Sequence, residues 1–203
     1  MKLARIPRHV GIIPDGNRRW AESRGRARRE GYAAGLAPGI LLLELCQELR
    51  IEEASVYGFT KENAKRPADQ VRAFREACVH FAAQAVRAGA ALLVIGDASS
   101  PVFPDPLRAY AGRRSPGAIR VNLLVNYGWQ WDLSGGSELR SREASRIDLV
   151  IRWGGRRRLS GFLPVQCAYA DIHVIDALWP DMRPEQFIDA LRWYENQDVT
   201  LGG

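Results

Sequence analysis

The chain has 203 residues, of which 46% are hydrophobic, so it can bury one sizeable core and fits a single domain over residues 1–203. Its 29 lysines and arginines exceed its 23 aspartates and glutamates, and the resulting net charge of +6 favours anionic partners: nucleic acid, an anionic membrane or phosphorylated small molecules. No apolar run approaches the roughly 18 residues of a membrane span, and residues 1–10 are too polar for a signal peptide, so we expect no integral membrane segment.

Strand-like apolar runs alternate with helical patterns along the chain. In chain order the pattern predicts a strand at 9–13, a helix at 33–49, a strand at 52–59, a helix at 68–88, a strand at 91–97, a weak helix, strands at 119–126, 148–152 and 171–175, and a helix at 184–196. Such alternation is typical of βαβ units. We therefore predict an α/β domain with a central, mostly parallel six-stranded sheet flanked by helices.

Polar clusters follow four of the predicted strands. They are PDGNRR at 14–19, TKENAKRP at 60–67, NYGWQWD at 126–132 and RWGGRRRLS at 152–160. Ligands of open parallel sheets bind at the carboxyl ends of the strands, so we expect these clusters to share one site. The Ser/Gly-rich stretch 133–146 is predicted to be a mobile surface linker.

Three cysteines, Cys46, Cys78 and Cys167, lie far apart in apolar surroundings without C-x-x-C spacing. This pattern predicts buried thiols in a reducing compartment, not a disulfide framework or a zinc site. We therefore expect a cytoplasmic protein.

Arginines dominate the four polar clusters and their surroundings, and guanidinium groups bind phosphate oxygens through paired hydrogen bonds. The cations are Arg18, Arg19, Arg26, Arg28, Arg66, Arg152, Arg156, Arg157 and Arg158. They exceed the needs of one phosphate and would suit two polyphosphate groups. Asp15 among them is either a salt-bridge partner or a ligand of Mg²⁺, which binds through one or two carboxylates plus substrate phosphates.

The common nucleotide-binding motifs are missing, because the chain has neither G-x-x-x-x-G-K-[ST] nor G-x-G-x-x-G after a strand. Nucleic-acid binding is an alternative from charge, with RGRARRE and GGRRRLS as its best evidence. Against it, the basic residues gather at strand ends and no aromatic residues are interleaved among them as a stacking surface. We expect no nucleic-acid partner.

Four ordered motifs resemble the cis-prenyltransferases, the undecaprenyl diphosphate synthase family, over nearly the full chain. HVGIIPDGNRRWA is similar to H-V-A-I-I-M-D-G-N-x-R-W-A, and YGFTKENAKRP is similar to Y-A-F-S-x-E-N-W-x-R-P. DLVIRWGGRRRLSGFLPVQCAYAD resembles D-L-V-I-R-T-G-G-E-x-R-L-S-N-F-L-L-W-Q-x-A-Y-A-E, and DALWPD and the terminal GG also fit. The resemblance implies an Mg²⁺-dependent prenyltransferase that uses isoprenoid diphosphates and forms a homodimer.

The resemblance also implies residue roles. Asp15 would hold Mg²⁺ on the diphosphate of the allylic donor, and Arg152, Arg158 and Ser160 would bind the diphosphate of the second substrate. The donor phosphates would be bound by Gly16, Asn17, Arg18, Arg19 and Arg28, and the further expected substrate-binding residues are Trp20, Tyr32, Arg66 and Phe74. Asp171 matches a glutamate that completes the metal site.

Thr60 and Asn63 match a serine and an asparagine linked to proton removal, so with Asp15 and Asn17 they are the expected catalytic residues. Two alternatives stay open. Thr60 and Asn63 could simply cap the helix that follows. Trp20, like Trp179, could pack in the core and not contact substrate.

Departures from the family motifs bear on the specific reaction. Pro14 replaces a Met, Tyr32 a His, Ala64 a Trp and Arg156 a Glu. The stretch between YGWQWD, which ends at residue 132, and IDLVIR, which begins at residue 147, is far shorter than in the long-chain enzymes of the family. The helix predicted at 68–88 is about a turn short. In the family this helix forms one wall of the tunnel that holds the growing chain, so we expect a shallow pocket and a product of about ten to fifteen carbons at most.

Some compact members of the family join two allylic diphosphates head-to-middle, giving lavandulyl-type branched products. With Arg156 at the second diphosphate site we favour that reaction, from dimethylallyl and also geranyl diphosphate. The alternative is regular head-to-tail condensation of isopentenyl diphosphate. A non-catalytic subunit of a heteromeric enzyme is the third reading: Asp15 argues against it, and DVTLGG at 198–203, which lacks a basic residue, leaves it some room.

Overall fold

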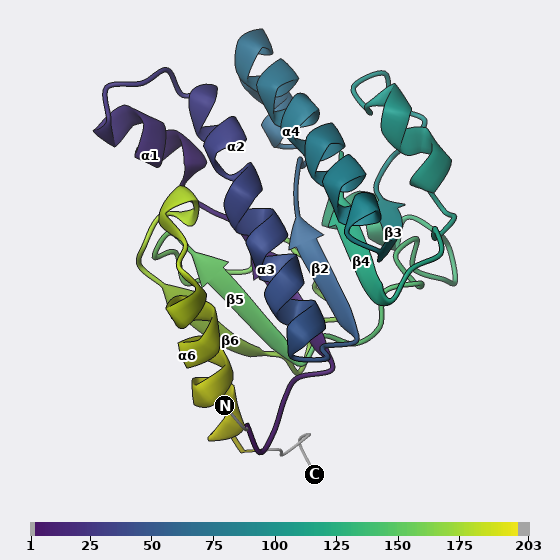
Figure 1. Ribbon diagram of the computed structural model, residues 1–203. Coiled ribbons are helices and arrows are strands. Elements are labelled where there is room, and N and C mark those ends of the chain that lie inside the picture. Colours follow the sequence, from purple (N-terminus) through teal and green to yellow (C-terminus); the bar gives the residue numbers. More distant parts are fainter. Residues whose placement is uncertain (1–2, 199–203) are drawn as a thin grey trace.

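Six parallel strands form the centre of the molecule in a computed structural model that describes residues 3–198 (Figure 1). The strands are β1 (His9–Ile13), β2 (Glu53–Tyr57), β3 (Ala90–Ile95), β4 (Ile119–Leu124), β5 (Leu149–Trp153) and β6 (Asp171–Ile175). Their order across the sheet is β3-β4-β2-β1-β5-β6, and every neighbouring pair is parallel. The α/β prediction is confirmed, and the sheet is wholly parallel where a mostly parallel one was expected.

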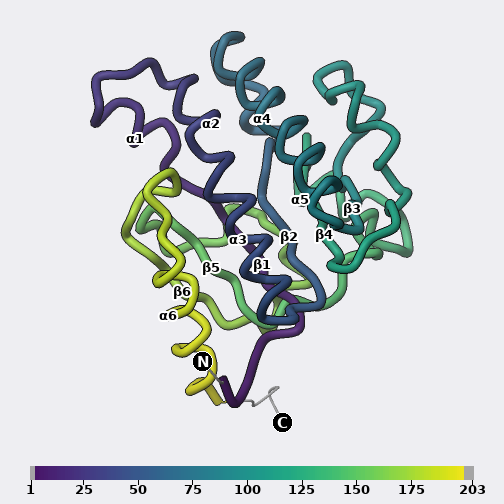
Figure 2. Tube along the Cα trace, viewed as in Figure 1, coloured from purple at the N-terminus to yellow at the C-terminus, as the bar shows by residue number. Residues whose placement is uncertain are grey.

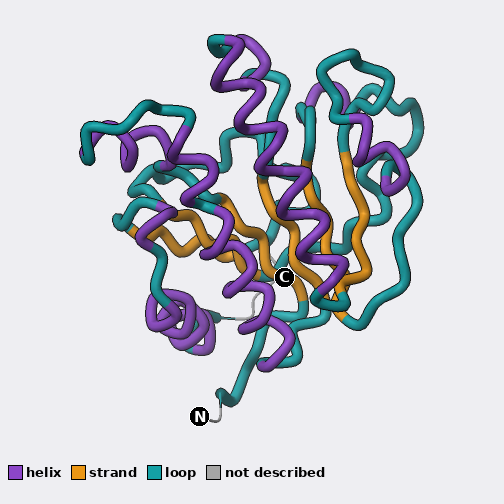
Figure 3. The backbone as a smooth tube through the Cα atoms, turned by 45° about the horizontal axis from the view of Figure 1, so that its top comes forward, coloured by secondary structure: helices purple, strands orange, loops and turns teal. Residues whose placement is uncertain are grey.

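The helices lie mainly on one face of this sheet (Figures 1 and 3). They are α1 (Asn17–Ser23), α2 (Glu30–Ala34), α3 (Leu36–Glu48), α4 (Ala68–Arg87), α5 (Trp129–Leu133) and α6 (Pro184–Glu195), with 3₁₀ turns η1 (Asn63–Lys65), η2 (Asp105–Tyr110) and η3 (Trp179–Asp181). Helices α3, α4 and α6 cover that face, whereas the opposite face is covered largely by irregular chain from 131–147 and 159–170.

The alternation of side chains along β1 shows how both faces are filled. Val10 and Ile12 join the core beneath the helices, and Ile13 joins the core on the other face. Gly11 faces Phe162, and a Cβ at this position would come within 2.6 Å of that ring. The irregular chain can therefore pack directly against the middle strand.

The predicted helix at 33–49 is divided between α2 and α3. Pro38 lies in the first turn of α3 and has no N–H to donate to the carbonyl of Ala34, so a continuous helix would lose a hydrogen bond there. The next carbonyl, that of Gly35, accepts a hydrogen bond from Trp179 Nε1 at 2.9 Å. The two short helices α1 and α5 were not predicted. Each has one buried residue, which is too few to show the hydrophobic periodicity of a helix in the sequence.

The segment 133–146 is held down by buried polar contacts, contrary to the mobile linker that we predicted. The buried carboxylate of Asp132 accepts hydrogen bonds from the main chain and the hydroxyl of Ser141, at 2.8 and 2.6 Å, and from Tyr127 at 2.8 Å. Ser141 is fully buried although its neighbours are exposed.

A second buried polar cluster lies across β1, β2 and β4, near the amino ends of these strands. His9 Nε2 lies 2.9 Å from Ser55 Oγ, and Asn122 donates to both Ser55 Oγ and Glu53 Oε1, at 2.9 and 2.6 Å. Ser145 Oγ donates to Glu53 at 2.8 Å and lies 3.0 Å from His9 Nδ1. Burial lowers the pKa of His9, so the imidazole is held in its neutral form.

The three cysteines are buried and unpaired, as predicted, and burial raises the pKa of each thiol. Within residues 3–198, no helix combines the length and the apolar character needed to cross a membrane.

Candidate active site

A polar cavity of about 560 Å³ opens at the carboxyl ends of β1, β2 and β5. The chain passes from β1 to β2 on one side and later returns to β5 on the other, so this is the switch point at which open parallel sheets bind ligands. Helices α1 and α2 extend beyond the strand ends and form one side of its rim (Figure 2).

Of the residues given roles by the family resemblance, all except Trp20 and Asp171 line this cavity, whereas Arg26 and Arg157 from the cationic set do not. Those that line it are Asp15, Gly16, Asn17, Arg18, Arg19, Arg28, Tyr32, Thr60, Asn63, Arg66, Phe74, Arg152, Arg158 and Ser160. With Arg156, seven arginines face three carboxylates among the described lining residues. The cavity therefore carries an excess of four positive charges and suits a strongly anionic ligand.

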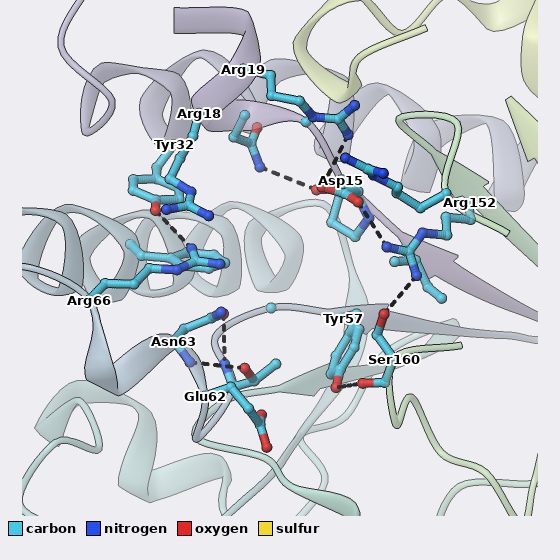
Figure 4. A pocket seen from close by; sticks show the side chains of 18 of the residues that line it. Asp15, Arg18, Arg19, Tyr32, Tyr57, Glu62, Asn63, Arg66, Arg152 and Ser160 are labelled. Atoms are coloured by element: carbon cyan, nitrogen blue, oxygen red, sulfur yellow. Dashed lines mark hydrogen bonds and ion pairs between the residues drawn. The ribbon is translucent and has the colours of Figure 1, made fainter. Parts of the chain in front are cut away.

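Asp15 stands at the centre of the cavity, two residues beyond β1 (Figure 4). Its Oδ2 lies 2.8 Å from Arg152 Nη2, and its Oδ1 lies 3.5 Å from Arg19 Nη2. About a third of its side chain is exposed to the cavity. Gly16 follows with φ 112°, and a Cβ there would lie 2.8 Å from Leu178, so only glycine suits this turn.

Arg152 is held rigidly from three directions. It lies on β5 opposite Ile13, and its side chain is only 5% exposed. Its Nη1 donates to Ser160 Oγ at 3.0 Å and to the carbonyl oxygen of Arg158. Because Nη2 bonds Asp15, the guanidinium joins the chain after β1 to the loop after β5.

Tyr57, the last residue of β2, also holds the loop that follows β5. Its hydroxyl donates to the carbonyl oxygen of Ser160 at 2.9 Å, and Ser160 has φ 53°, in the left-handed region. Burial raises the pKa of Tyr57, so this residue is a permanent hydrogen-bond donor. The sequence analysis did not single out Tyr57, because the last residue of a buried strand looks like an ordinary core position.

A glycine turn places Arg19 beside Asp15. Arg19 Nη2 donates to the carbonyl of Gly154 at 2.8 Å. Gly154 has φ 86°, and a Cβ on it would lie 2.6 Å from that same nitrogen. Any other residue would therefore be strained and would displace Arg19.

Arg18, Arg66 and Tyr32 form a second group on the other side of Asp15 from Arg152 and Ser160 (Figure 4). Arg66 Nη1 donates to the hydroxyl of Tyr32 at 2.9 Å. Tyr32 stacks on Phe74 with ring centroids 4.5 Å apart. Burial lowers the pKa of Arg66, and the charge of Arg18 adds to that effect, so an anion between them would relieve both.

Thr60 and Asn63 hold the turn between β2 and α4 by reciprocal bonds. Asn63 Oδ1 accepts from the main chain of Thr60 at 3.1 Å, and Thr60 Oγ1 accepts from the main chain of Asn63 at 3.2 Å. No side chain caps α4, whose N-cap is Pro67, so the capping alternative is not borne out for that helix; these contacts instead close the turn that enters η1. They use acceptor atoms only, so the hydroxyl hydrogen of Thr60 and the amide hydrogens of Asn63 remain for a ligand.

A small apolar hollow of about 60 Å³ adjoins the polar cavity and shares Tyr32, Tyr57 and Phe74 with it. Its other walls include Leu36, Val56, Ala77, Cys78, Phe81, Leu123 and Trp179. One water-sized group needs about 10–15 Å³. The hollow therefore has room for only a small apolar group.

Trp20 lies outside the lining of this cavity. Its Nε1 donates to Asp181 at 2.8 Å, and the Arg24 guanidinium stands 4.4 Å from its ring centroid. Trp179 is 3% exposed and belongs to the core. Trp179 is thus a core residue, as the packing alternative has it, and it also lines the apolar hollow. Trp20 is half-buried and lies outside both the core and the lining of the cavity, so neither alternative describes it.

Asp171 lies far from Asp15 within the chain. It is the first residue of β6 and pairs with Leu149, whereas Arg152, which contacts Asp15, pairs with Val174. Asp171 therefore lies three residues along the strand, about 10 Å, from the position level with Arg152 and Asp15. Burial raises the pKa of Asp171. Among residues 3–198, no group of three or more His, Cys, Asp or Glu side chains forms a ready metal site.

The polar cluster after β4, which we expected at the rim, does not line the cavity. It supports the site instead, because Tyr127 pairs with Thr60 in an isolated bridge and accepts a hydrogen bond from the main chain of Lys61 at 2.9 Å. Glu22 and Glu62 do line the cavity, and the sequence analysis missed both. Glu62 lies between two expected catalytic residues, but its position in the chain says nothing about the direction of its side chain.

Comparisons with known proteins agree with this geometry. The model of the family described as "Putative undecaprenyl diphosphate synthase" matches residues 13–138 and 135–202. The ditrans,polycis-undecaprenyl-diphosphate synthase ((2E,6E)-farnesyl-diphosphate specific) of Yersinia pseudotuberculosis is 31% identical over 98% of this chain and 91% of its own length. An isoprenyl transferase of Leptospira interrogans is 29% identical over 98% of this chain and 95% of its own length.

Among solved structures, the chain is similar to lavandulyl diphosphate synthase from Lavandula x intermedia in complex with dimethylallyl diphosphate. The TM-score is 0.86, and the match covers 98% of this chain and 99% of the other. At 22% identity this likeness establishes the fold.

Proposed function

The chain belongs to the cis-prenyltransferase family, the undecaprenyl diphosphate synthases and their relatives, and on that premise we propose that it joins allylic diphosphates head-to-middle into a short, branched lavandulyl-type diphosphate. The observation that carries this proposal is the presence of two cationic groups, Arg18 with Arg66 on one side of Asp15 and Arg152 with Arg158 on the other. They adjoin a hollow with room for about one five-carbon unit. Two diphosphates and little hydrocarbon fit such a site.

The donor is proposed to bind between Asp15 and the group formed by Arg18, Arg28 and Arg66. Its allylic carbon–oxygen bond breaks there, and the cations stabilise the charge that develops on the leaving diphosphate. Arg66 is half buried, and within residues 3–198 Tyr32 is the one side chain to which it donates a hydrogen bond, so its remaining N–H groups are ready for phosphate oxygens.

The residues around Asp15 fit an Mg²⁺ ion held jointly with substrate. Mg²⁺ is commonly bound through one or two carboxylates plus phosphate oxygens, and Asp15 is a partly exposed carboxylate in a cavity built for phosphates. When bound, the ion would neutralise charge on the departing diphosphate. Asp15 would hold it, and Arg152 and Arg19 would orient the carboxylate.

The second substrate is proposed to bind through Arg152, Arg158 and Ser160. Arg156 lines the same side of the cavity, where the family motif has an acidic residue. We propose that this extra cation changes how the acceptor is held. A dimethylallyl unit then presents its C2 to the incoming allylic carbon.

The coupling balances without a further reactant. C2 of the acceptor supplies its π electrons to C1 of the donor as the donor's carbon–oxygen bond breaks and diphosphate leaves. The tertiary cation left at C3 of the acceptor loses a methyl proton to an oxygen of the diphosphate released from the donor, which restores a double bond. The hydroxyl of Thr60 and the amide of Asn63 line the cavity and are proposed to guide that proton loss.

Regular condensation of isopentenyl diphosphate is the second candidate, and the curated relatives favour it. The 31% identical proteins are named undecaprenyl-diphosphate synthases specific for farnesyl diphosphate. A hollow of about 60 Å³ does not fit a donor of that length, so on this candidate too the product is short.

Purified protein incubated with Mg²⁺ and dimethylallyl diphosphate alone distinguishes the two reactions. We expect a branched ten-carbon diphosphate, identified after dephosphorylation, and a longer branched product when geranyl diphosphate is added. Only the regular reaction depends on isopentenyl diphosphate, because dimethylallyl diphosphate lacks the terminal methylene that attacks the donor in ordinary chain growth. A linear cis product that forms only with isopentenyl diphosphate would exclude the head-to-middle reaction.

We further propose a homodimer that uses the edge strand β6. Ile172 on β6 and Val165 and Tyr169 in the segment before it are exposed at 41%, 50% and 62%, and exposed apolar residues beside an edge strand favour pairing with another chain. Asp171 begins that strand, so it could complete a metal site only in a partner subunit. Mixing the Asp15→Ala and Asp171→Ala proteins should restore part of the activity if one intact site forms in the mixed dimer.

A further inference from the structure

Lys61 forms an ion pair that ties the turn between Thr60 and Asn63 to a distant strand. Its Nζ lies 2.8 Å from Oδ2 of Asp97, which follows β3 at the same edge of the sheet. The side chains are 38% and 19% exposed, so the pair is partly shielded from water. The two residues are 36 positions apart in the chain.

Asp97 is itself firmly held. Ser99 Oγ donates to its Oδ1 at 2.6 Å, and the main chain of Asp97 exchanges hydrogen bonds with Asn126, at 3.1 Å from the Asn126 side chain and 3.3 Å to its carbonyl. Hydrogen bonds from Lys61 and Ser99 lower the pKa of Asp97, which keeps it ionised. The carboxylate is thus a fixed point anchored to the ends of β3 and β4.

The main chain and the aliphatic stem of Lys61 are also held in place. Its main-chain N–H donates to the carbonyl of Tyr127 at 2.9 Å, and its aliphatic stem passes over Gly128, where a Cβ would lie 3.3 Å from Lys61 Cδ. We define these contacts, the Lys61–Asp97 ion pair and the Lys61–Tyr127 bond, as the loop brace.

We propose, on the basis of the function proposed above, that Lys61 and Asp97 are positioning residues whose ion pair sets the place of Thr60 and Asn63 in the cavity. The reciprocal bonds between Thr60 and Asn63 make their turn a unit, so a shift of the turn moves both groups together. A displacement of about 1 Å can lower a rate by about a hundredfold. A partly exposed ion pair adds little to global stability, so its loss should act on geometry and not on folding.

Lys61→Met tests this role, because it keeps the stem over Gly128 and removes the charge. Asp97→Asn removes the charge from the other side and can still accept from Ser99. We expect both variants to lose about ten- to a hundredfold in kcat, with KM for both diphosphates within about twofold of wild type and an unchanged melting temperature. Lys61→Arg should recover most of the lost kcat.

Arg142→Met is the matched control. It removes one partner of the 2.9 Å Arg142–Glu138 ion pair, which is more exposed and contributes no residue to the cavity. We expect wild-type kcat from this variant. Wild-type kcat in both Lys61→Met and Asp97→Asn, or a loss that appears only in KM or in the folded fraction, would overturn the proposal.

Hydrogen–deuterium exchange gives a readout that needs no turnover. Amide exchange across residues 60–66 should be faster in Lys61→Met than in Arg142→Met or wild type. Absence of product from every allylic diphosphate would reject the proposed function, whereas exchange at wild-type rates in Lys61→Met would reject the loop brace alone.

Discussion

Asp15 and Arg152 lie 137 residues apart in the chain and meet at 2.8 Å in the middle of the cavity. The pair joins the two cationic groups, because Asp15 belongs to the donor side and Arg152 also bonds Ser160 on the acceptor side. Each charge is neutralised by the other in the free protein. If Arg152 binds the acceptor as proposed, a diphosphate there would weaken its hold on Asp15 and so couple the two proposed sites.

Asp15→Ala should abolish turnover and leave the fold intact. The substitution removes the carboxylate that we propose supports ionisation of the donor. Arg152 keeps its bonds to Ser160 and Arg158, so the loss of stability should be about 1–3 kcal/mol, less than the total stability of a typical domain. Product formation and circular dichroism measure the two effects. Near-normal turnover in this variant would remove Asp15 from the mechanism.

Arg158→Ala should raise KM for the acceptor diphosphate. A lost charge-assisted hydrogen bond costs about 1.5–3 kcal/mol, which corresponds to about a ten- to hundredfold increase. Arg157→Ala is the control, because Arg157 is an exposed neighbour that does not line the cavity. Arg152→Ala should raise the acceptor KM as well. Unchanged acceptor kinetics in both Arg152→Ala and Arg158→Ala would place the second diphosphate elsewhere.

Phe74→Ala should allow longer prenyl chains. Phe74 stacks on Tyr32 at 4.5 Å and lines both the cavity and the hollow, so its removal joins the two spaces. We expect farnesyl diphosphate to become a usable donor, measured by chromatography of the dephosphorylated products. Phe74→Leu fills more of the space and should keep the short product. Normal turnover with unchanged donor preference in Phe74→Ala would show that other residues limit the length.

Stability should fall as the pH is lowered from about 7.5 to about 5.5. Burial holds the pKa of His9 below its ordinary value of about 6.5, so in this range the unfolded chain binds more protons than the folded one. Partial burial lowers the pKa of His173 in the same direction. Urea unfolding at several pH values measures the slope.

His9→Gln should flatten that slope, whereas replacing the exposed His80 by Gln should leave it as in wild type. A wild-type slope in His9→Gln would assign the pH dependence to other groups.

Most of the fold could be predicted from short windows of the chain. Apolar runs such as 9–13 and 171–175 coincide with β1 and β6, and the 68–88 pattern coincides with α4, because hydrophobic periodicity is a local property. Helix α1 was missed, since Ala21 is its only buried residue and leaves no period to detect.

The residues of the site could also be predicted in large part, because polar clusters at strand ends and ordered family motifs are visible in the sequence. Their geometry could not. The terminal glycines that fit the family motif, Gly202 and Gly203, lie outside the described residues. Asp171 and Trp20 occupy matching motif positions, yet the structure puts Asp171 at the amino end of its strand and turns Trp20 toward Asp181.

By itself the sequence determined the α/β class, the parallel strand pattern and the arginine-rich chemistry, because each is carried by residues that are neighbours in the chain. Only the tertiary structure decided that Arg152 holds Asp15, that Tyr127 supports Thr60 from outside the cavity, and that Tyr32 and Phe74 limit the hollow. These contacts depend on β1 lying between β2 and β5 and on the direction of each side chain. Strand order and side-chain direction come from packing the whole core, so no local window of sequence specifies them.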